Sequence, residues 1–132
     1  MFLQNAQTFD TKRVDDIIQF NYGIYYYKQK KYNEALSYFE ETIKINSDYY
    51  RAYLMLADCY YYLNEPDLVV TYMEQGLSRS PYNQEDRRYL IKFLLDYGRV
   101  DEAVYHAIRF GDYASNKEEG DRLYEETKRL QR

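Results

Sequence analysis

The stretch "NYGIYYYKQKKYNEALSYFEE", residues 21–41, decides the fold of this chain. Apolar residues recur at helical spacing on both sides of a break near "QKKY". After the break the stripe runs through Ala35, Leu36, Phe39 and Ile43. This pattern predicts a hairpin of two helices joined by a short loop, with the many tyrosines as part of its packing.

The same pattern returns at intervals of 34 residues along the chain. The series in phase are Ala35, Val69 and Ala103; Gly23, Ala57 and Ile91; Tyr26, Tyr60 and Leu94; Tyr38, Tyr72 and His106; and, at the breaks, Lys30, Asn64 and Gly98. Pro66 suits the first turn of a helix, and Gly98 suits the left-handed turn that ends one. Several series in one phase indicate three consecutive helical hairpins.

With this period the chain resembles the tetratricopeptide repeat family over residues 16–110. The residues at the motif positions are Gly23, Tyr26, Ala35 and Phe39 in the first unit, Tyr53 (for Trp), Leu56, Tyr60 and Pro81 in the second, and Leu90 and Ala103 in the third, where Arg87 replaces Trp. The resemblance implies an all-α, right-handed α-solenoid of three helix-turn-helix repeats followed by a C-terminal capping helix.

We expect one domain over residues 1–132. Its parts are an N-terminal segment (1–15), repeats at 16–49, 50–83 and 84–111, the last one degenerate, and the capping helix at 112–132. Ser115 with Glu118 fits a capping box, and Leu123, Thr127 and Leu130 form a narrow apolar stripe. Gly120 lowers helix propensity by about 1 kcal/mol and favours a start near Asp121. A solvent-exposed tail is the alternative.

Residues 1–10 carry Phe2, Leu3 and Phe9 without a clear helical stripe. These side chains could cover the first hairpin, insert into a neighbouring molecule, or be disordered. The sequence leaves these three alternatives open.

Small residues in the first helix of a unit let the second helix approach closely, while rings fill the remaining space. Tyr22, Tyr26 and Tyr32 are expected to serve as such core or inter-helix aromatics. In the third unit the volumes are reversed, with Ile91 where Gly23 stands and Ala107 where Phe39 stands. We therefore expect Ile91 and Ala107 to lie near each other.

Composition argues against several functions. The formal net charge of −4 gives no support for nucleic-acid binding, no apolar run is long enough to span a membrane, and no secretion signal is visible. Cys59, the only cysteine, fits a reducing compartment such as the cytoplasm, and its repeat slot predicts a buried, unreactive thiol. His106 is expected to be a half-exposed aromatic. No catalytic residue, metal site or cofactor motif is apparent, so we expect a protein that is not an enzyme.

The family resemblance implies a groove on the inner face of the first helices of the repeats. The candidate partner-binding residues are Phe20, Tyr27, Lys28, Arg51, Leu54, Met55, Asp58, Tyr61, Tyr62, Arg88 and Lys92, with Ile24, Glu85, Tyr89, Leu95 and Asp96 on the same face. Tyr27, Tyr61 and Tyr62 fall in line along it. They could instead pack between neighbouring helices.

One subgroup of the family holds a chaperone's C-terminal carboxylate with lysine, asparagine and arginine side chains. The matching positions here are Phe20, Ile24, Met55, Glu85 and Tyr89, none of which keeps the required type. The groove favours an apolar or aromatic-bearing segment of a partner protein instead.

Two other functions remain as alternatives to a protein-interaction module. The chain could be a structural block that self-associates into a homo-oligomer or forms part of a longer repeat array. Stacked tyrosines could bind single-stranded nucleic acid, for which the only local basic cluster is Arg51, Arg87, Arg88 and Lys92.

Overall fold

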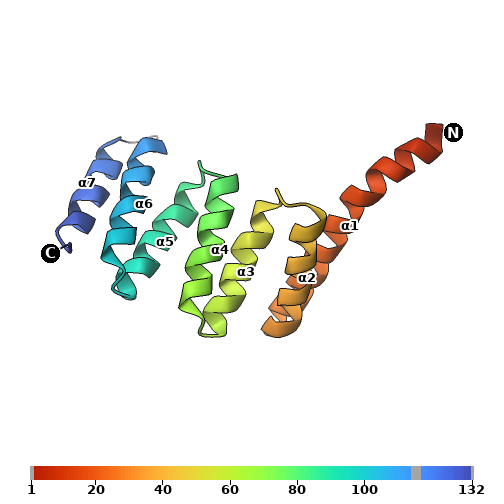
Figure 1. Ribbon diagram of the computed structural model, residues 1–132, viewed down its shortest axis with the longest axis horizontal. Coiled ribbons are helices and arrows are strands. Elements are labelled where there is room, and N and C mark those ends of the chain that lie inside the picture. The colour runs from red at the N-terminus through yellow and green to blue at the C-terminus, as the bar shows by residue number, and fades with distance from the viewer. Residues whose placement is uncertain (1, 114–116, 132) are drawn as a thin grey trace. The chain divides into compact units, whose positions relative to one another are not determined.

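The computed structural model describes residues 2–113 and 117–131, and for residues 2–13 and 113 only the backbone is described. Within these ranges the regular structure is entirely helical (Figure 1). The helices are α1 (Phe2–Lys28), α2 (Tyr32–Ile45), α3 (Tyr50–Tyr62), α4 (Pro66–Arg79), α5 (Gln84–Asp96), α6 (Val100–Tyr113) and α7 (Lys117–Lys128). The predicted all-α fold of helical hairpins is confirmed.

The chain divides into two compact units, Met1–Arg79 and Ser80–Arg132. In the first unit α1 pairs with α2 and α3 with α4, and the two hairpins are joined where α2 packs against α3. In the second unit α5 pairs with α6, and α7 packs against α6. The last helix therefore covers one side of the third hairpin, as expected of a cap.

The loops inside the three hairpins have the same backbone geometry. Lys30, Asn64 and Gly98 have positive φ angles of 61°, 60° and 73°. In each loop the next amide donates to a carbonyl oxygen five residues earlier, at N···O distances of 3.0, 2.9 and 2.8 Å. This arrangement ends a helix with a left-handed residue. The 34-residue phase therefore fixes the turns as well as the helices.

The centre of each hairpin is a small side chain on its second helix. Ala35, Val69 and Ala103 are 0%, 1% and 0% exposed. In the first hairpin Gly23 of α1 lies against the ring of Phe39, because a Cβ added at Gly23 would be only 2.5 Å from a ring carbon. The glycine therefore makes room for a fully buried phenylalanine.

Tyrosine rings stack inside the first two hairpins at equivalent positions. The ring centroids of Tyr26 and Tyr38 are 5.3 Å apart with an interplanar angle of 8°, and those of Tyr60 and Tyr72 are 5.5 Å apart at 13°. Such pairs bury aromatic area between the two helices of a hairpin. Much of the tyrosine excess is thus hairpin packing.

His106 holds the third position of this series and is only 4% exposed. The expectation of a half-exposed aromatic was therefore wrong. The Nη1 atom of Arg87 lies 3.4 Å from its Nδ1 atom, and Tyr105 packs edge-on against the imidazole. The change of partner, from a stacked tyrosine to a buried guanidinium, draws the histidine inward.

Arg87 also reproduces a hydrogen bond that Tyr53 makes one repeat earlier. The hydroxyl of Tyr53 donates to the carbonyl oxygen of Ser47 at 2.9 Å, and Nη2 of Arg87 donates to that of Pro81 at 3.2 Å. In both cases the acceptor lies six residues before the donor, in the turn between hairpins. Different side chains at the Trp position of the repeat thus satisfy the same backbone group.

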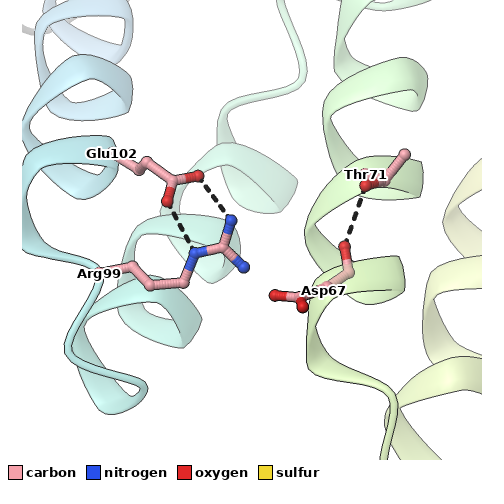
Figure 2. Close-up of polar contacts among 4 residues, drawn as sticks. All are labelled: Asp67, Thr71, Arg99 and Glu102. Carbon is pink, nitrogen blue, oxygen red and sulfur yellow. Dashed lines mark hydrogen bonds and ion pairs between the residues drawn. The ribbon is translucent and has the colours of Figure 1, made fainter.

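Local polar contacts support the second helices of two hairpins (Figure 2). In α4 the hydroxyl of Thr71 donates to the carbonyl oxygen of Asp67 at 3.0 Å. Just before α6, Arg99 donates to both carboxylate oxygens of Glu102, at 2.7 and 2.8 Å. Each contact joins residues three or four positions apart at the start of its helix.

The C-terminal helix differs from the prediction in two details. It begins at Lys117, before Gly120, instead of near Asp121. Gly120 is buried. A Cβ added at Gly111 of α6 would lie 4.0 Å from the carbonyl carbon of Gly120. The two glycines therefore let the backbones of α6 and α7 approach each other. Leu130 does not join the stripe, because α7 ends at Lys128 and Leu130 is 55% exposed. Ser115 lies outside the described residues.

The N-terminal residues continue α1 backwards to Phe2. Residues 2–10 are thus helical although their sequence has no clear apolar stripe. Figure 1 shows α1 extending beyond the hairpin that it forms with α2. The side chains of Phe2, Leu3 and Phe9 are outside the described part. Within residues 2–113 and 117–131, no helix is both long and apolar enough to cross a membrane.

Candidate functional site

Four tyrosines gather at one end of the first unit, where three helices meet. Tyr27 comes from α1, Tyr32 begins α2, and Tyr61 and Tyr62 end α3. The Tyr32 and Tyr62 rings stack with centroids 4.7 Å apart at 8°, while Tyr27 and Tyr61 meet Tyr62 nearly edge-on at 6.3 and 5.3 Å. We call this group the tyrosine face.

Two rings of the tyrosine face remain open to solvent. Tyr61 is 45% and Tyr62 is 52% exposed, whereas Tyr27 and Tyr32 are half-buried beneath them. Tyr62 packs on both inner rings and Tyr61 packs on Tyr62, so contact with a partner orders side chains that already have neighbours and costs less entropy. Tyr32 was expected as a core or inter-helix aromatic, and its half-buried ring contacts Tyr27 of α1 and Tyr62 of α3. Tyr32 is the first residue of α2 and lies next to the loop, and this position could have predicted its contact with the end of α3.

The pKa values of the two inner phenols of the tyrosine face, Tyr27 and Tyr32, are raised above the ordinary value. Burial, then the Asp58 carboxylate and Tyr62, raise the pKa of Tyr27 well above its usual value. Burial and Tyr62 also raise the pKa of Tyr32. Neutral hydroxyls can donate and accept hydrogen bonds, so the face offers apolar rings with polar tips and a half-buried carboxylate beside them.

We expect the folded chain to lose stability as the pH rises through and above 10. The pKa is raised above the ordinary 10.0 for Tyr27, Tyr32, Tyr38, Tyr49, Tyr60 and Tyr72, mostly by burial and for Tyr38 first by the phenol of Tyr26. The unfolded chain therefore releases these protons first, so their contribution is complete below pH 10 and is lost above it. Urea unfolding at a series of pH values measures the effect, and Tyr27→Phe should flatten the decline. A stability that is constant or rises over this range would contradict the expectation.

Phe20 does not line an open groove, in contrast to the prediction. It is 3% exposed, and its ring lies 5.5 Å from that of Phe39 and 4.9 Å from that of Tyr49. The guanidinium of Arg51 lies 5.2 Å above the same ring. Phe20 therefore belongs to the core between the hairpins, and Arg51 covers it from the solvent side.

Other predicted groove residues of the first unit are only partly accessible. Leu54 packs towards α4, because a Cβ added at Gly76 would lie 2.8 Å from its Cδ2 atom. Ile24 and Met55 are half-buried against the core that contains Phe39. Lys28 is exposed at the end of α1. The open part of the predicted surface in this unit therefore centres on the tyrosine face.

The predicted residues of the second unit form a separate group. Arg88 is ion-paired with Glu119 of α7, and its guanidinium lies 5.1 Å above the ring of Phe110. It therefore helps to attach α7 to the third hairpin and is not free to hold a ligand. Lys92 is exposed, as is Tyr89 at 43%.

The thiol of Cys59 is buried, as its repeat position predicts. Cys59 is fully buried, and burial, with a smaller effect of Asp58, raises the pKa of its thiol to about 12. A thiol with such a pKa is a poor nucleophile at neutral pH. No group of three or more His, Cys, Asp or Glu side chains in the described ranges is arranged to hold a metal ion.

The family comparison agrees with this architecture. Residues 26–69 match the model described as tetratricopeptide repeat, a segment that contains the stacked Tyr26, all of α2 and α3, and the central Val69. These residues therefore contain a tetratricopeptide repeat. Among curated proteins, none matches the sequence.

Solved structures similar to this chain share its fold at low sequence identity. The first TPR of Spaghetti (RPAP3), bound to the HSP90 peptide SRMEEVD, is 14% identical with a TM-score of 0.65, covering 87% of this chain and 94% of that chain. The Yersinia enterocolitica type III secretion chaperone SycD, in complex with a peptide of the translocator YopD, is 19% identical with a TM-score of 0.64, covering 85% and 86%. MamA AMB-1 is 21% identical with a TM-score of 0.68, covering 87% and 63%.

Proposed function

We propose that this protein is a non-enzymatic interaction module that binds a segment of a partner protein on the tyrosine face. The observation that carries the proposal is the pair of half-exposed rings, Tyr61 and Tyr62, of which Tyr62 packs on Tyr27 and Tyr32 while Tyr61 packs on Tyr62. Aromatic rings that are pre-positioned and open to solvent are enriched at protein interfaces. Two structures of the same fold have peptides bound, which supports the same kind of role here.

The chemistry of the face favours a segment with apolar or aromatic side chains. An acidic C-terminal segment, such as the peptide bound by Spaghetti, is a poor fit. The first unit offers a carboxylate, Asp58, beside the rings, and Met55 stands at one of the positions where the carboxylate-binding subgroup carries a polar side chain. A partner carboxylate at this place would be repelled by Asp58.

Selection of peptides from a displayed random library tests this function without a known partner. We expect the enriched peptides to carry aromatic or aliphatic residues, and Tyr61→Ala with Tyr62→Ala to weaken their binding by at least tenfold, or about 1.4 kcal/mol. Binding is measured by fluorescence anisotropy with the labelled peptides. The helical content of the double variant, measured by circular dichroism, shows whether the fold is retained.

A matched control is available in the second unit. Tyr82 and Tyr97 are 75% and 51% exposed, so the double alanine variant removes a similar amount of exposed ring. This variant should bind the selected peptides as the parent does. Equal losses in both double variants, or none in either, would refute the tyrosine face as the site. Unfolding caused by Tyr61→Ala and Tyr62→Ala would also refute it, since it would assign both rings to the core.

A further inference from the structure

A second open surface lies on α1, away from the tyrosine face. Val14, Ile18, Tyr22 and Tyr25 follow one another at steps of four, four and three residues, so they lie on one side of the helix. They are 47%, 41%, 51% and 59% exposed. A shallow hollow is lined by Ile18, Tyr22 and Tyr25 together with Asn21. We call Val14, Ile18, Tyr22 and Tyr25 the α1 stripe. Tyr22, expected as a core or inter-helix aromatic, stacks on Tyr38 of α2 with the ring centroids 5.4 Å apart, so it is an inter-helix ring that stays half-exposed.

The repeat phase shows what such a stripe does elsewhere in the molecule. Thirty-four residues later Ile18, Tyr22 and Tyr25 correspond to Ala52, Leu56 and Cys59 of α3. All three of these are 0% exposed and belong to one core cluster with Ala35 and Phe39 of the preceding hairpin, whose helix α2 packs against α3. The α1 stripe is thus the same stacking surface without a helix on top of it.

A preceding hairpin joined in the manner of α2 and α3 would not fit against this stripe. The chain turns between α2 and α3 at residues 46–49, and the equivalent residues are 12–15. These residues lie inside α1, which is helical from Phe2 to Lys28. A helix that covers the stripe must therefore be connected differently from the way in which α2 is connected to α3.

We propose that a second copy of this chain covers the α1 stripe, with two α1 helices packed side by side about a two-fold axis. An apolar stripe on a straight helix is complementary to itself in an antiparallel pair. Helix α1 has 27 residues and its hairpin partner α2 has 14, so about half of its length is available to a neighbour. The stripe exposes on the order of several hundred Å², the size of patch that marks association sites.

This area is below the standard of about 800 Å² for each partner in a stable complex, so the dimer dissociates on dilution. Sedimentation equilibrium of the full chain over about 1 to 100 µM should show a rise from the monomer mass to twice that mass. Ile18→Lys places a charge in the stripe and should shift the midpoint of this rise by at least tenfold in concentration. Ile108→Lys is the matched control, since Ile108 is 46% exposed on α6.

The outcomes decide the proposal. A dimer that Ile18→Lys dissociates and Ile108→Lys leaves intact supports it. A monomer at every concentration, or a dimer that Ile18→Lys leaves unchanged, overturns it, because the stripe would then be covered by something else or not at all. Peptide binding by Tyr61 and Tyr62 is measured on a different surface, so either proposal can fail alone.

Discussion

Replacing Phe39 by alanine is expected to lower the free energy of unfolding by about 3–5 kcal/mol, the usual cost of removing a fully buried phenylalanine. Phe39 is 0% exposed and fills the space that Gly23 leaves open between α1 and α2. Its ring also meets Phe20, which is buried with it. Urea unfolding followed by circular dichroism measures the loss.

A second substitution tests whether this loss reflects volume at one contact. Gly23→Ile alone should destabilise by about 1–3 kcal/mol or more, because its Cβ would lie 2.5 Å from a ring carbon of Phe39. Combined with Phe39→Ala, the isoleucine fills the vacated space, and the double variant should be more stable than either single one. Losses that simply add would contradict this account.

The third hairpin carries this exchanged combination at the equivalent positions. Ile91 and Ala107 are 1% and 0% exposed, on helices that pack together. That the two side chains contact each other stays a prediction. Rescue in the first hairpin would support it, since the same volumes would then be shown to fit the same slots.

Leu56→Ala is expected to cost about 2–5 kcal/mol, whereas Tyr22→Ala, at the equivalent position one repeat earlier, should cost about 1 kcal/mol. Leu56 is fully buried in the core shared by the first two hairpins. Tyr22 is half-exposed and loses mainly its stack on Tyr38, whose centroid is 5.4 Å away. Truncation at the same repeat position is thus expected to lower the free energy of unfolding by different amounts, depending on whether another helix covers that position.

Both variants are compared by urea unfolding at a protein concentration low enough to keep the chain monomeric. Self-association through α1 would otherwise add to the apparent stability of the parent and exaggerate the effect of Tyr22→Ala. Similar losses for the two variants would mean that the α1 stripe is buried in the monomer.

The features that sequence predicted well are those that the 34-residue phase controls. The phase located the left-handed turns at Lys30, Asn64 and Gly98 and the buried centres of the hairpins. These features depend on contacts inside one hairpin, which each repeat carries with it. Local contacts of this kind can be read from spacing alone.

The errors arose where the neighbourhood of a slot differs between repeats. Tyr22 stacks on Tyr38 of α2 but stays half-exposed, because no earlier hairpin in the described part of the chain packs on α1 as α2 packs on α3. Phe20 is buried because Phe39, Tyr49 and Arg51 surround it. His106 is buried beside Arg87, whereas the equivalent position one repeat earlier holds Tyr53. Spacing assigns a residue to a slot but does not say which side chains occupy the adjoining slots.

The prediction of the binding residues was limited in the same way. Tyr27, Tyr61 and Tyr62 were predicted as groove residues, and the structure adds Tyr32 from the start of α2. Arg88 was predicted for the groove as well, yet it pairs with Glu119 in a helix that the repeat pattern does not include. Helix α7 supplies a side chain, Glu119, that pairs with a residue of the neighbouring hairpin.

Amide chemical-shift mapping with a selected peptide tests the docking role of the tyrosine face most directly. The account predicts that the largest shifts on titration occur at Tyr27, Asp58, Tyr61 and Tyr62, with small changes along Val14 to Tyr25 and through the second unit. Shifts confined to α5, α6 and α7, or to the α1 stripe, would contradict it.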